Sequence, residues 1–222
     1  MALLASSAYG KPCPPMSLQP KILTPDRGTL AAKGGGIVVA AQPVYTRHAD
    51  HKPDLQPTWR VRAGSQTIAP GVRPIAPGLS VYDVGEARGE LVLEDMDQKA
   101  LLRVTRRKLA PLAAPKPKRV WSTESVRTTR RPYAMVSVEL EGKAPATAVA
   151  LVVFGADGAA RSWGAVTGDV STTAVVYSTG GGCGAIAPGT LSTHAGERVR
   201  LAWLDGAGRL SKLSAPIRVV RR

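Results

Sequence analysis

The sequence predicts an all-β protein made of two sandwich domains in tandem, on three observations. Apolar residues occur in short segments that alternate or run continuously, without the spacing of an amphipathic helix. The chain holds 18 prolines and 23 glycines, which interrupt it too often for helices of several turns. Its 222 residues also suit two sandwiches of about 100 residues each.

In the first half, Pro20, Pro25 and Gly28 indicate an edge strand and a turn, because proline cannot donate to a central ladder. The segment 59–63 alternates, with Trp59, Val61 and Ala63 on one face and arginines on the other. We expect strands at 37–41, 59–63, 79–84, 90–94 and 101–105, with a hairpin turn at 95–99.

In the second half, two Asp-Gly pairs separate apolar runs and are strong hairpin signals. They are Asp157-Gly158 and Asp205-Gly206. We expect strands at 119–122, 133–140, 148–154, 160–166, 174–177, 198–204 and 210–220.

A boundary between the halves is predicted at 110–117, where three prolines among small residues suit a semi-rigid linker. The tetrapeptide Ile-Ala-Pro-Gly at 75–78 recurs at 186–189, which is mild support for two similar units. The predicted organisation is a signal-peptide remnant and lead-in at 1–19, a sandwich at 20–109, the linker at 110–117 and a sandwich at 118–222.

The segment 195–219 holds a Gly, an alternating strand, an Asp-x-x-Gly turn and a final strand. The segment 25–30 has the pattern Pro-x-x-Gly-x-Leu. Together they resemble the end and the start of bacterial Ig-like and fibronectin type III-like exported modules. The resemblance implies two Ig-like β-sandwiches and a binding or spacing role in the cell envelope.

Export is predicted from the first ten residues, a short apolar run followed by small residues, with Ser6 and Ala8 suited to signal-peptidase cleavage. A cytosolic chain with a disordered start is the alternative. No apolar run is long enough for a membrane span. Cys13 and Cys183 are compatible with one disulfide in an oxidising compartment.

The positive charge is concentrated near the predicted linker. The chain carries a net charge of +14, and between Asp97 and Glu139 it has eleven basic residues and one acidic residue. Such a basic junction attracts anionic polymers or surfaces, although a solvated linker also explains it. The candidate anion-binding residues are Arg103, Arg106, Arg107, Lys108, Lys116, Lys118, Arg119, Arg127, Arg130 and Arg131.

We therefore expect a non-enzymatic exported protein, without a cofactor, that binds anionic polysaccharide, lipopolysaccharide or another envelope protein. Sequence-specific nucleic-acid recognition is not expected, because no zinc-finger, helix-turn-helix or RNP pattern is present. Trp59, Trp163 and Trp203 lie in alternating segments and are expected in the core, whereas Trp121 borders the basic segment.

The alternative is an enzyme of unknown substrate. Cys183 lies in a glycine-rich run and could act as a nucleophile with His194 as its base. His48 and His51 could hold a metal ion, but no regularly spaced third and fourth ligands follow. The common hydrolase motifs are missing from the sequence.

Overall fold

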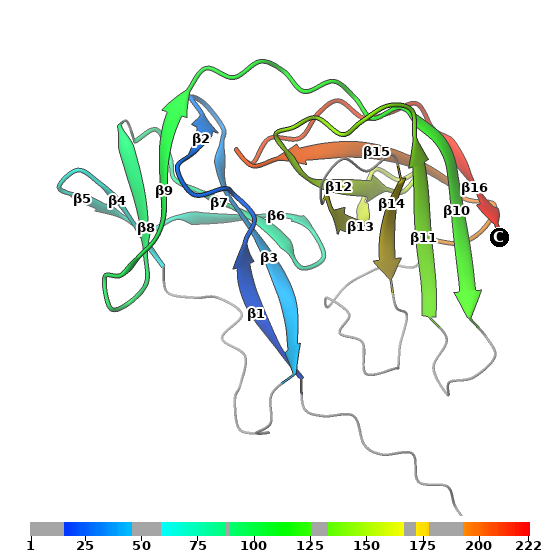
Figure 1. Ribbon diagram of the computed structural model, residues 1–222, viewed down its shortest axis with the longest axis horizontal. Helices are drawn as coiled ribbons and strands as arrows, with labels where there is room; N and C mark the ends of the chain where they lie inside the picture. Colours follow the sequence, from blue (N-terminus) through cyan, green and yellow to red (C-terminus); the bar gives the residue numbers. More distant parts are fainter. Residues whose placement is uncertain (1–15, 46–58, 88, 126–132, 167–171, 178–192) are drawn as a thin grey trace, which may run out of the picture.

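The computed structural model describes residues 16–45, 59–87, 89–125, 133–166, 172–177 and 193–222, and these residues form strands and no helix. No helix that could cross a membrane is found among them. Figure 1 shows the arrangement of the strands. They are β1 Met16–Ile22, β2 Gly28–Ala31, β3 Gly36–Tyr45, β4 Arg60–Ala63, β5 Gln66–Ile68, β6 Gly71–Ala76, β7 Leu79–Asp83, β8 Glu90–Glu94, β9 Ala100–Arg107, β10 Pro117–Ser125, β11 Tyr133–Leu140, β12 Ala148–Phe154, β13 Ala160–Ala165, β14 Thr172–Tyr177, β15 Arg198–Asp205 and β16 Ile217–Arg221.

The amino-terminal half contains two sheets that pack face to face. One has the strand order β1-β3-β7-β6 and the other the order β2-β9-β8-β4-β5, in which β2 runs parallel to β9. Their inner faces bury a common apolar layer, as in a β-sandwich. This amino-terminal core consists of Leu30, Ile37, Val39, Val61, Tyr82, Val84, Leu91, Leu93, Leu102 and Val104.

The carboxy-terminal half is one sheet with the order β13-β12-β15-β16-β10-β11-β14. Its two edge strands, β13 and β14, lie close to each other, so the sheet rolls around its own apolar interior. Within it, β10 runs parallel to β16 while the other pairs are antiparallel. The carboxy-terminal core consists of Val120, Val136, Val138, Leu140, Ala148, Leu151, Val153, Val199, Leu201, Trp203 and Val219.

A third apolar cluster joins the two halves. Alternate residues of β3 face opposite sides, so Ile37 enters the amino-terminal core while Val38 turns toward β12 and β15. In β12, Leu151 and Val152 divide in the same way. Strands buried on both faces explain why β3 and β12 read as continuous apolar runs. This shared core consists of Val38, Ala40, Ala76, Leu79, Val81, Ala150, Val152 and Leu204.

The loop after β15 holds the halves together through hydrogen bonds to its backbone carbonyls. Thr24 Oγ1 donates to the Gly206 carbonyl over 2.8 Å, and the Gly36 N–H donates to the Ala207 carbonyl over 2.9 Å. Gly208 has a φ of 77°, and a Cβ there would lie 2.7 Å from the Gly36 carbonyl oxygen. The two backbones therefore approach each other at a distance that only glycine allows.

The buried carboxylate of Asp205 holds this loop in shape. Its Oδ1 accepts the N–H groups of Ala207 and Arg209 over 3.1 and 2.8 Å. Its Oδ2 accepts two donors of the Arg209 guanidinium, over 2.9 and 2.8 Å. Arg209 also donates to the carbonyls of Leu109 and Ala110, over 3.2 and 3.0 Å. The segment that connects β9 to β10 is thus bound at its start to the carboxy-terminal half.

Most predicted strands are confirmed, and both Asp-Gly pairs lie in turns, as predicted. The hairpin turn at 95–99 is closed by the Asp95 N–H, which donates to the Lys99 carbonyl. Strands β5 and β6 were missed by the sequence analysis, since the first is short and the second contains Pro74. The second Ile-Ala-Pro-Gly segment lies outside the described residues.

The prediction of one strand over 210–220 is wrong, because only Ile217–Arg221 pairs as a strand. In the segment before β16, serine hydroxyl oxygens accept hydrogen bonds from β15 that backbone carbonyls would accept in a regular strand pair. Ser211 Oγ accepts the Trp203 N–H and Ser214 Oγ accepts the Leu201 N–H, each over 3.0 Å. The backbone N–H groups of Ser211 and Ser214 donate in return to the Trp203 and Leu201 carbonyls, each over 2.8 Å. Pro216 interrupts the segment before β16 begins.

The described residues form three β-sheets and no helix, consistent with a β-sandwich architecture. The segment 108–116 contains no strand and crosses from β9 to β10 along one side of the molecule (Figure 1). The division into two domains at 110–117 stays a prediction.

Candidate anion-binding face

The predicted basic junction is divided between two sheets. Arg103, Arg106 and Arg107 lie on β9 of the five-stranded sheet, whereas Lys118 and Arg119 lie on β10 of the seven-stranded sheet. In Figure 1 these two strands stand well apart. Lys108 and Lys116 are exposed on the connecting segment. Arg127, Arg130 and Arg131 lie outside the described residues.

On β9, two of the candidate arginines have structural partners. The Arg106 guanidinium donates to the carbonyls of Ala31 and Gly85, so it ties β2 and the turn after β7 to β9. Arg103 lies 3.5 Å from a carboxylate oxygen of Glu90, beside a shallow pocket of about 300 Å³ that Arg27 also lines. This sheet therefore offers mixed charge rather than a continuous positive surface.

Arg103 also acts through its backbone. Its N–H donates to Asp26 Oδ1 over 2.9 Å. This hydrogen bond is the largest of the effects that lower the pKa of the exposed Asp26 carboxyl below its usual value, and the charges of Arg27 and Arg103 lower it further. Asp26 in this way links the turn before β2 to β9.

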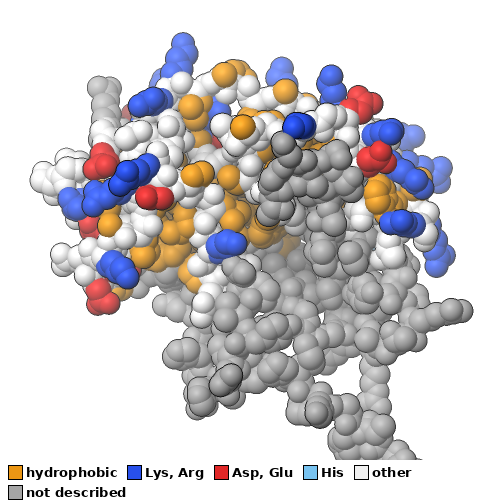
Figure 2. All heavy atoms as spheres, in the orientation of Figure 1, with side chains coloured by type: hydrophobic (Ala, Val, Ile, Leu, Met, Phe, Trp, Pro, Cys, Tyr) orange, Lys and Arg blue, Asp and Glu red, His pale blue; other side chains and the backbone are white. Residues whose placement is uncertain are grey.

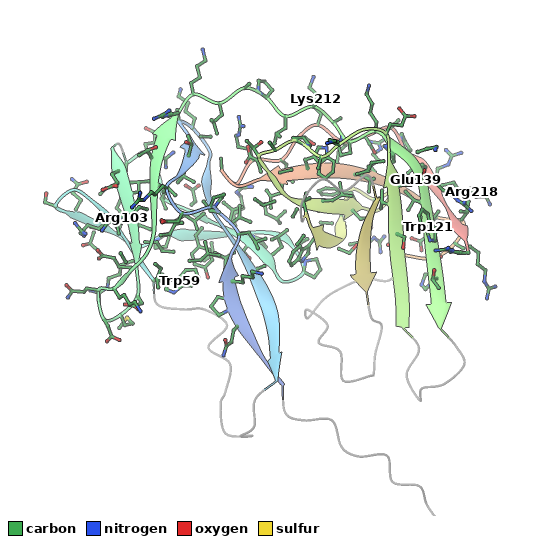
Figure 3. The ribbon with its side chains drawn as sticks, in the orientation of Figure 1. Trp59, Arg103, Trp121, Glu139, Lys212 and Arg218 are labelled. Carbon is green, nitrogen blue, oxygen red and sulfur yellow. The ribbon has the colours of Figure 1, made fainter. Side chains whose placement is uncertain are left out.

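On the seven-stranded sheet, strand pairing brings together arginines that are distant in sequence. In the parallel pair of β10 and β16, Val120 is opposite Val219. The residues that precede these two, Arg119 and Arg218, are therefore also neighbours. In the antiparallel pair, Arg218 is opposite Arg198. Because the three alternate with buried neighbours, they lie on the outer face of β10, β16 and β15 in one row across the strands. Figure 3 labels Arg218 close to Trp121, at the outer side of β10 and β16.

Trp121 lies on the same outer face, two residues after Arg119. The Arg119 and Arg222 guanidinium carbons lie 5.6 and 5.7 Å from the centroid of its ring. Both are within the range of a cation–π interaction, which holds a guanidinium in place and leaves its N–H edges free to bind. The indole Nε1 is buried and has no hydrogen-bond partner in the described structure. We call Arg119, Trp121, Arg198, Arg218 and Arg222 the arginine–tryptophan face.

Glu139 lies beside this face, but its ion pair is made with a residue outside the face. Glu139, opposite Arg119 on β11, forms its ion pair with Lys118 Nζ over 3.0 Å. Lys118 is the extra residue of a β-bulge, which turns it toward that carboxylate. No described carboxylate lies within ion-pair distance of Arg119, Arg198 or Arg218. Figure 2 shows the resulting group of Lys and Arg side chains over the edge of the molecule where β10 and β16 lie.

Such a row has a cost in the unliganded protein. Like charges on adjacent strands repel and lower the stability of a sheet. An anion that bridges the arginines removes this repulsion and gains charge-assisted hydrogen bonds. The arrangement can therefore bind anions.

The basic segment of the sequence includes Arg119 but not Arg198, Arg218 or Arg222. These three were not predicted because they are separated from Arg119 by many residues, whereas the predicted site rested on charge that is dense along the chain. A local signal did exist: arginine alternates with apolar residues at 198–201, as in a strand with one exposed face.

The other predicted sites have different outcomes. Cys13, Cys183, His48 and His51 lie outside the described residues, so the disulfide, the thiol nucleophile and the metal site remain predictions. His194 is described and exposed in the loop before β15. The described residues contain no group of three or more side chains that could hold a metal ion.

The prediction for the other tryptophans is confirmed. Trp203 is buried in the carboxy-terminal core, and Trp59 packs on Tyr82 with ring centroids 5.4 Å apart. Trp163 packs against the shared core and donates its Nε1 hydrogen to the Pro77 carbonyl over 3.0 Å. Trp121 is the tryptophan that belongs to none of the three described apolar clusters.

No protein-family model and no curated protein matches the chain. Several solved structures resemble it weakly, including the three that follow. A biofilm-associated protein BSP domain has a TM-score of 0.29 at 12% identity, over 91% of this chain and 29% of that one. A Bacteroides ovatus mixed-linkage glucan utilization locus protein, SGBP-B, solved with a mixed-linkage heptasaccharide, has a TM-score of 0.27 at 12% identity, over 92% and 45%. A tetra-tandem repeat from the extending region of a large adhesion protein has a TM-score of 0.22 at 15% identity, over 92% and 49%. The chain thus spans less than half the length of each.

Proposed function

We propose that this chain is a non-enzymatic exported protein that binds anionic polymers or surfaces through the arginine–tryptophan face. The observation that carries the proposal is the row of Arg119, Arg218 and Arg198 on three adjacent strands, without a described carboxylate to pair them. A row of this kind attracts polyanions, and the attraction weakens as salt is added.

The proposed architecture is two Ig-like sandwiches in tandem. Two features of the strand order support it. In each half, an early strand runs parallel to the last one, β2 to β9 and β10 to β16. The amino-terminal half also divides into a four-stranded and a five-stranded sheet over one core, which suits a sandwich of this class.

The proposed location is the cell envelope or the exterior, supported by the short apolar segment and the small residues at 1–10. The proposed partners there are anionic polysaccharide, lipopolysaccharide or another envelope protein. All three can present carboxylate or phosphate groups to an exposed guanidinium.

The test compares retention on immobilised heparin and lipopolysaccharide across a salt gradient. One variant combines Arg119→Gln, Arg218→Gln and Arg222→Gln. The matched control removes the same charge from exposed positions in the other half, at Lys33, Arg60 and Lys99.

We expect the face variant to elute at lower salt than the control, with the slope of log affinity against log salt reduced by about two. Equal elution of the two variants contradicts the proposal, because retention then follows net charge alone. A third variant, at Arg103, Arg107 and Lys108, measures the contribution of β9. Arg106 is left unchanged, since its hydrogen bonds to Ala31 and Gly85 support the fold.

A further inference from the structure

The arginine–tryptophan face offers more than one guanidinium to a single small anion. Arg218 stands between Arg119 and Arg198 on adjacent strands, and all three residues are exposed. Side chains that are direct neighbours across a ladder start about 5 Å apart, which is less than the length of an arginine side chain. An anion above Arg218 is therefore within reach of a second guanidinium and meets a concentrated positive charge.

The cations of this face are all arginines. Lys118, the lysine of β10, is paired with Glu139 over 3.0 Å and does not belong to the face. A guanidinium presents a planar fork that matches the oxygens of a carboxylate or a phosphate, whereas a lysine ammonium acts as a point charge. The residue type therefore indicates a ligand group that carries two or more oxygens on one atom.

Arg119 is held in place for such a ligand. Its guanidinium carbon lies 5.6 Å from the centroid of the Trp121 ring, and that of Arg222 lies over the same ring at 5.7 Å. The contact with the ring leaves the N–H edges of the guanidinium free to bind. A bound anion accepts from the free edge of Arg119 while the ring contact stays intact. Less side-chain freedom is then lost on binding than for an unrestrained arginine.

We infer that the ligand group is a phosphate monoester, bound by Arg119 and Arg218 together, with Arg198 beside it. This inference rests on the proposed function and names its ligand chemistry. A phosphate monoester has three terminal oxygens and a charge of about −1.5 to −2 at pH 7. It can pair with one guanidinium fork and still accept from the next arginine. It also neutralises nearly two of the positive charges that repel each other on adjacent strands.

Other anionic groups use this arrangement less fully. A carboxylate has a single charge and two oxygens, which one guanidinium fork occupies. A sulfate ester has three terminal oxygens but a single charge, and each phosphodiester of a nucleic acid also has a single charge. The arginines of the face thus have more positive charge in reach than any one of these groups neutralises.

The phosphate is assigned to a sugar of a polysaccharide rather than to a lipid surface. A lipid surface is bound by apolar side chains that enter it. On the described strands of this face, the large apolar residue that is exposed is Val220, at 38%, and arginines surround it. A phosphorylated polysaccharide needs no such apolar contact.

The test measures the affinity of the full chain for dextran phosphate and dextran sulfate of equal length and degree of substitution, by isothermal titration calorimetry. The two polymers differ in how their charge depends on pH, because the phosphate monoester alone gains a second charge, with a pKa of about 6. Each affinity is measured at about pH 7.5 and at about pH 5, on either side of that pKa. Vesicles of phosphatidylcholine with phosphatidic acid present the phosphate monoester on a lipid surface instead.

The same design accounts for ionisable groups of the protein. Arginine stays charged throughout this pH range. Ionisable side chains beside the face in the described structure include Lys118, Glu139, His194 and Glu197. A change in their charge alters the affinity for both polymers, so the ratio of the two affinities isolates the effect of the ligand.

The variant Arg218→Gln removes one of the two guanidiniums that bind the phosphate. Its matched control is Arg60→Gln, which removes one charge from an exposed position on β4 in the other half. Far-UV circular dichroism establishes that each variant is folded. We expect Arg218→Gln to lower the phosphate-to-sulfate affinity ratio several-fold, whereas Arg60→Gln leaves it unchanged.

For the wild-type chain we expect dextran phosphate to bind about tenfold more tightly than dextran sulfate at about pH 7.5, and this ratio to fall several-fold at about pH 5. If the ratio is near one, does not change with pH or is the same in Arg218→Gln, the phosphate assignment is overturned and the proposed function stands. Tighter binding to the phosphatidic acid vesicles than to dextran phosphate overturns the assignment to a sugar. If the chain binds neither dextran nor heparin, the proposed function itself fails.

Discussion

The Asp205 loop permits a sharp test of how the two halves are held together. Replacing Asp205 by alanine removes four hydrogen bonds from a carboxylate that is 1% exposed. It also leaves the guanidinium of Arg209 with two backbone carbonyls as its remaining acceptors. Removing one partner of a buried ion pair typically costs about 3–5 kcal/mol. Since the Arg209 side chain is 23% exposed and can be hydrated in part, we expect the lower end of that range.

The chain contains its own control for this experiment. Asp157 and Arg161 have the same spacing and also lie at a turn, with Asp157 Oδ1 accepting the Ala159 N–H and Oδ2 accepting an Arg161 donor. The Asp157 side chain is 54% exposed, unlike that of Asp205. Because water already hydrates the Asp157 carboxylate, this pair is expected to contribute about 1 kcal/mol, so Asp157→Ala should cost less than Asp205→Ala.

The assay is urea unfolding followed by tryptophan fluorescence and far-UV circular dichroism, together with thermolysin cleavage near Leu109. We expect Asp205→Ala to lower the free energy of unfolding and to speed cleavage of the connecting segment, because Arg209 no longer holds it. Asp205→Asn keeps one acceptor and is expected to lie between wild type and alanine. The reasoning is refuted if Asp205→Ala costs no more than Asp157→Ala and leaves the cleavage rate unchanged.

Three further predictions follow from single contacts. Gly208→Ala is expected to lower the free energy of unfolding in urea by about 2 kcal/mol or more, because the φ of Gly208 is positive and an added Cβ meets the Gly36 carbonyl. Gly158→Ala is the control and is expected to lose about 1 kcal/mol, because Gly158 has a φ of 78° but open space around an added Cβ. Equal losses in the two variants argue against the close approach of the Gly208 and Gly36 backbones. Trp163→Phe is expected to cost about 1 kcal/mol through the lost bond to the Pro77 carbonyl, and a neutral result in thermal unfolding contradicts this. The lowered pKa of Asp26 stabilises the fold above the unfolded carboxyl pKa of about 3.9, and this contribution is lost as pH falls through the folded pKa. Wild type should therefore lose more stability than Asp26→Asn between pH 5 and pH 3, and parallel curves in urea titrations oppose this.

The sequence by itself determined where many of the strands lie. The strands at 133–140 and 148–154 have their predicted bounds, and the Asp-Gly pairs at 157 and 205 form turns. These features depend on residues that are neighbours along the chain, through side-chain alternation and the backbone freedom of glycine. Local chemistry was therefore enough to locate them.

The candidate site was only partly visible in the sequence. Charge density along the chain pointed to Arg119, and the position of Trp121 beside the basic segment was noted. Arg106 was counted among the binding residues, whereas its guanidinium donates to two backbone carbonyls. A count of charges cannot distinguish a guanidinium used inside the fold from one that faces solvent.

The tertiary structure alone decided which strands became neighbours. The parallel pairing of β10 with β16 puts Arg222 over Trp121, and the pairing of β16 with β15 completes the arginine row. It also decided that β3 and β12 are buried on both faces, so that the halves share an apolar core. The physical reason is that alternation shows which residues of a strand turn inward or outward, while the partner across the ladder is chosen by packing and hydrogen bonds between distant segments.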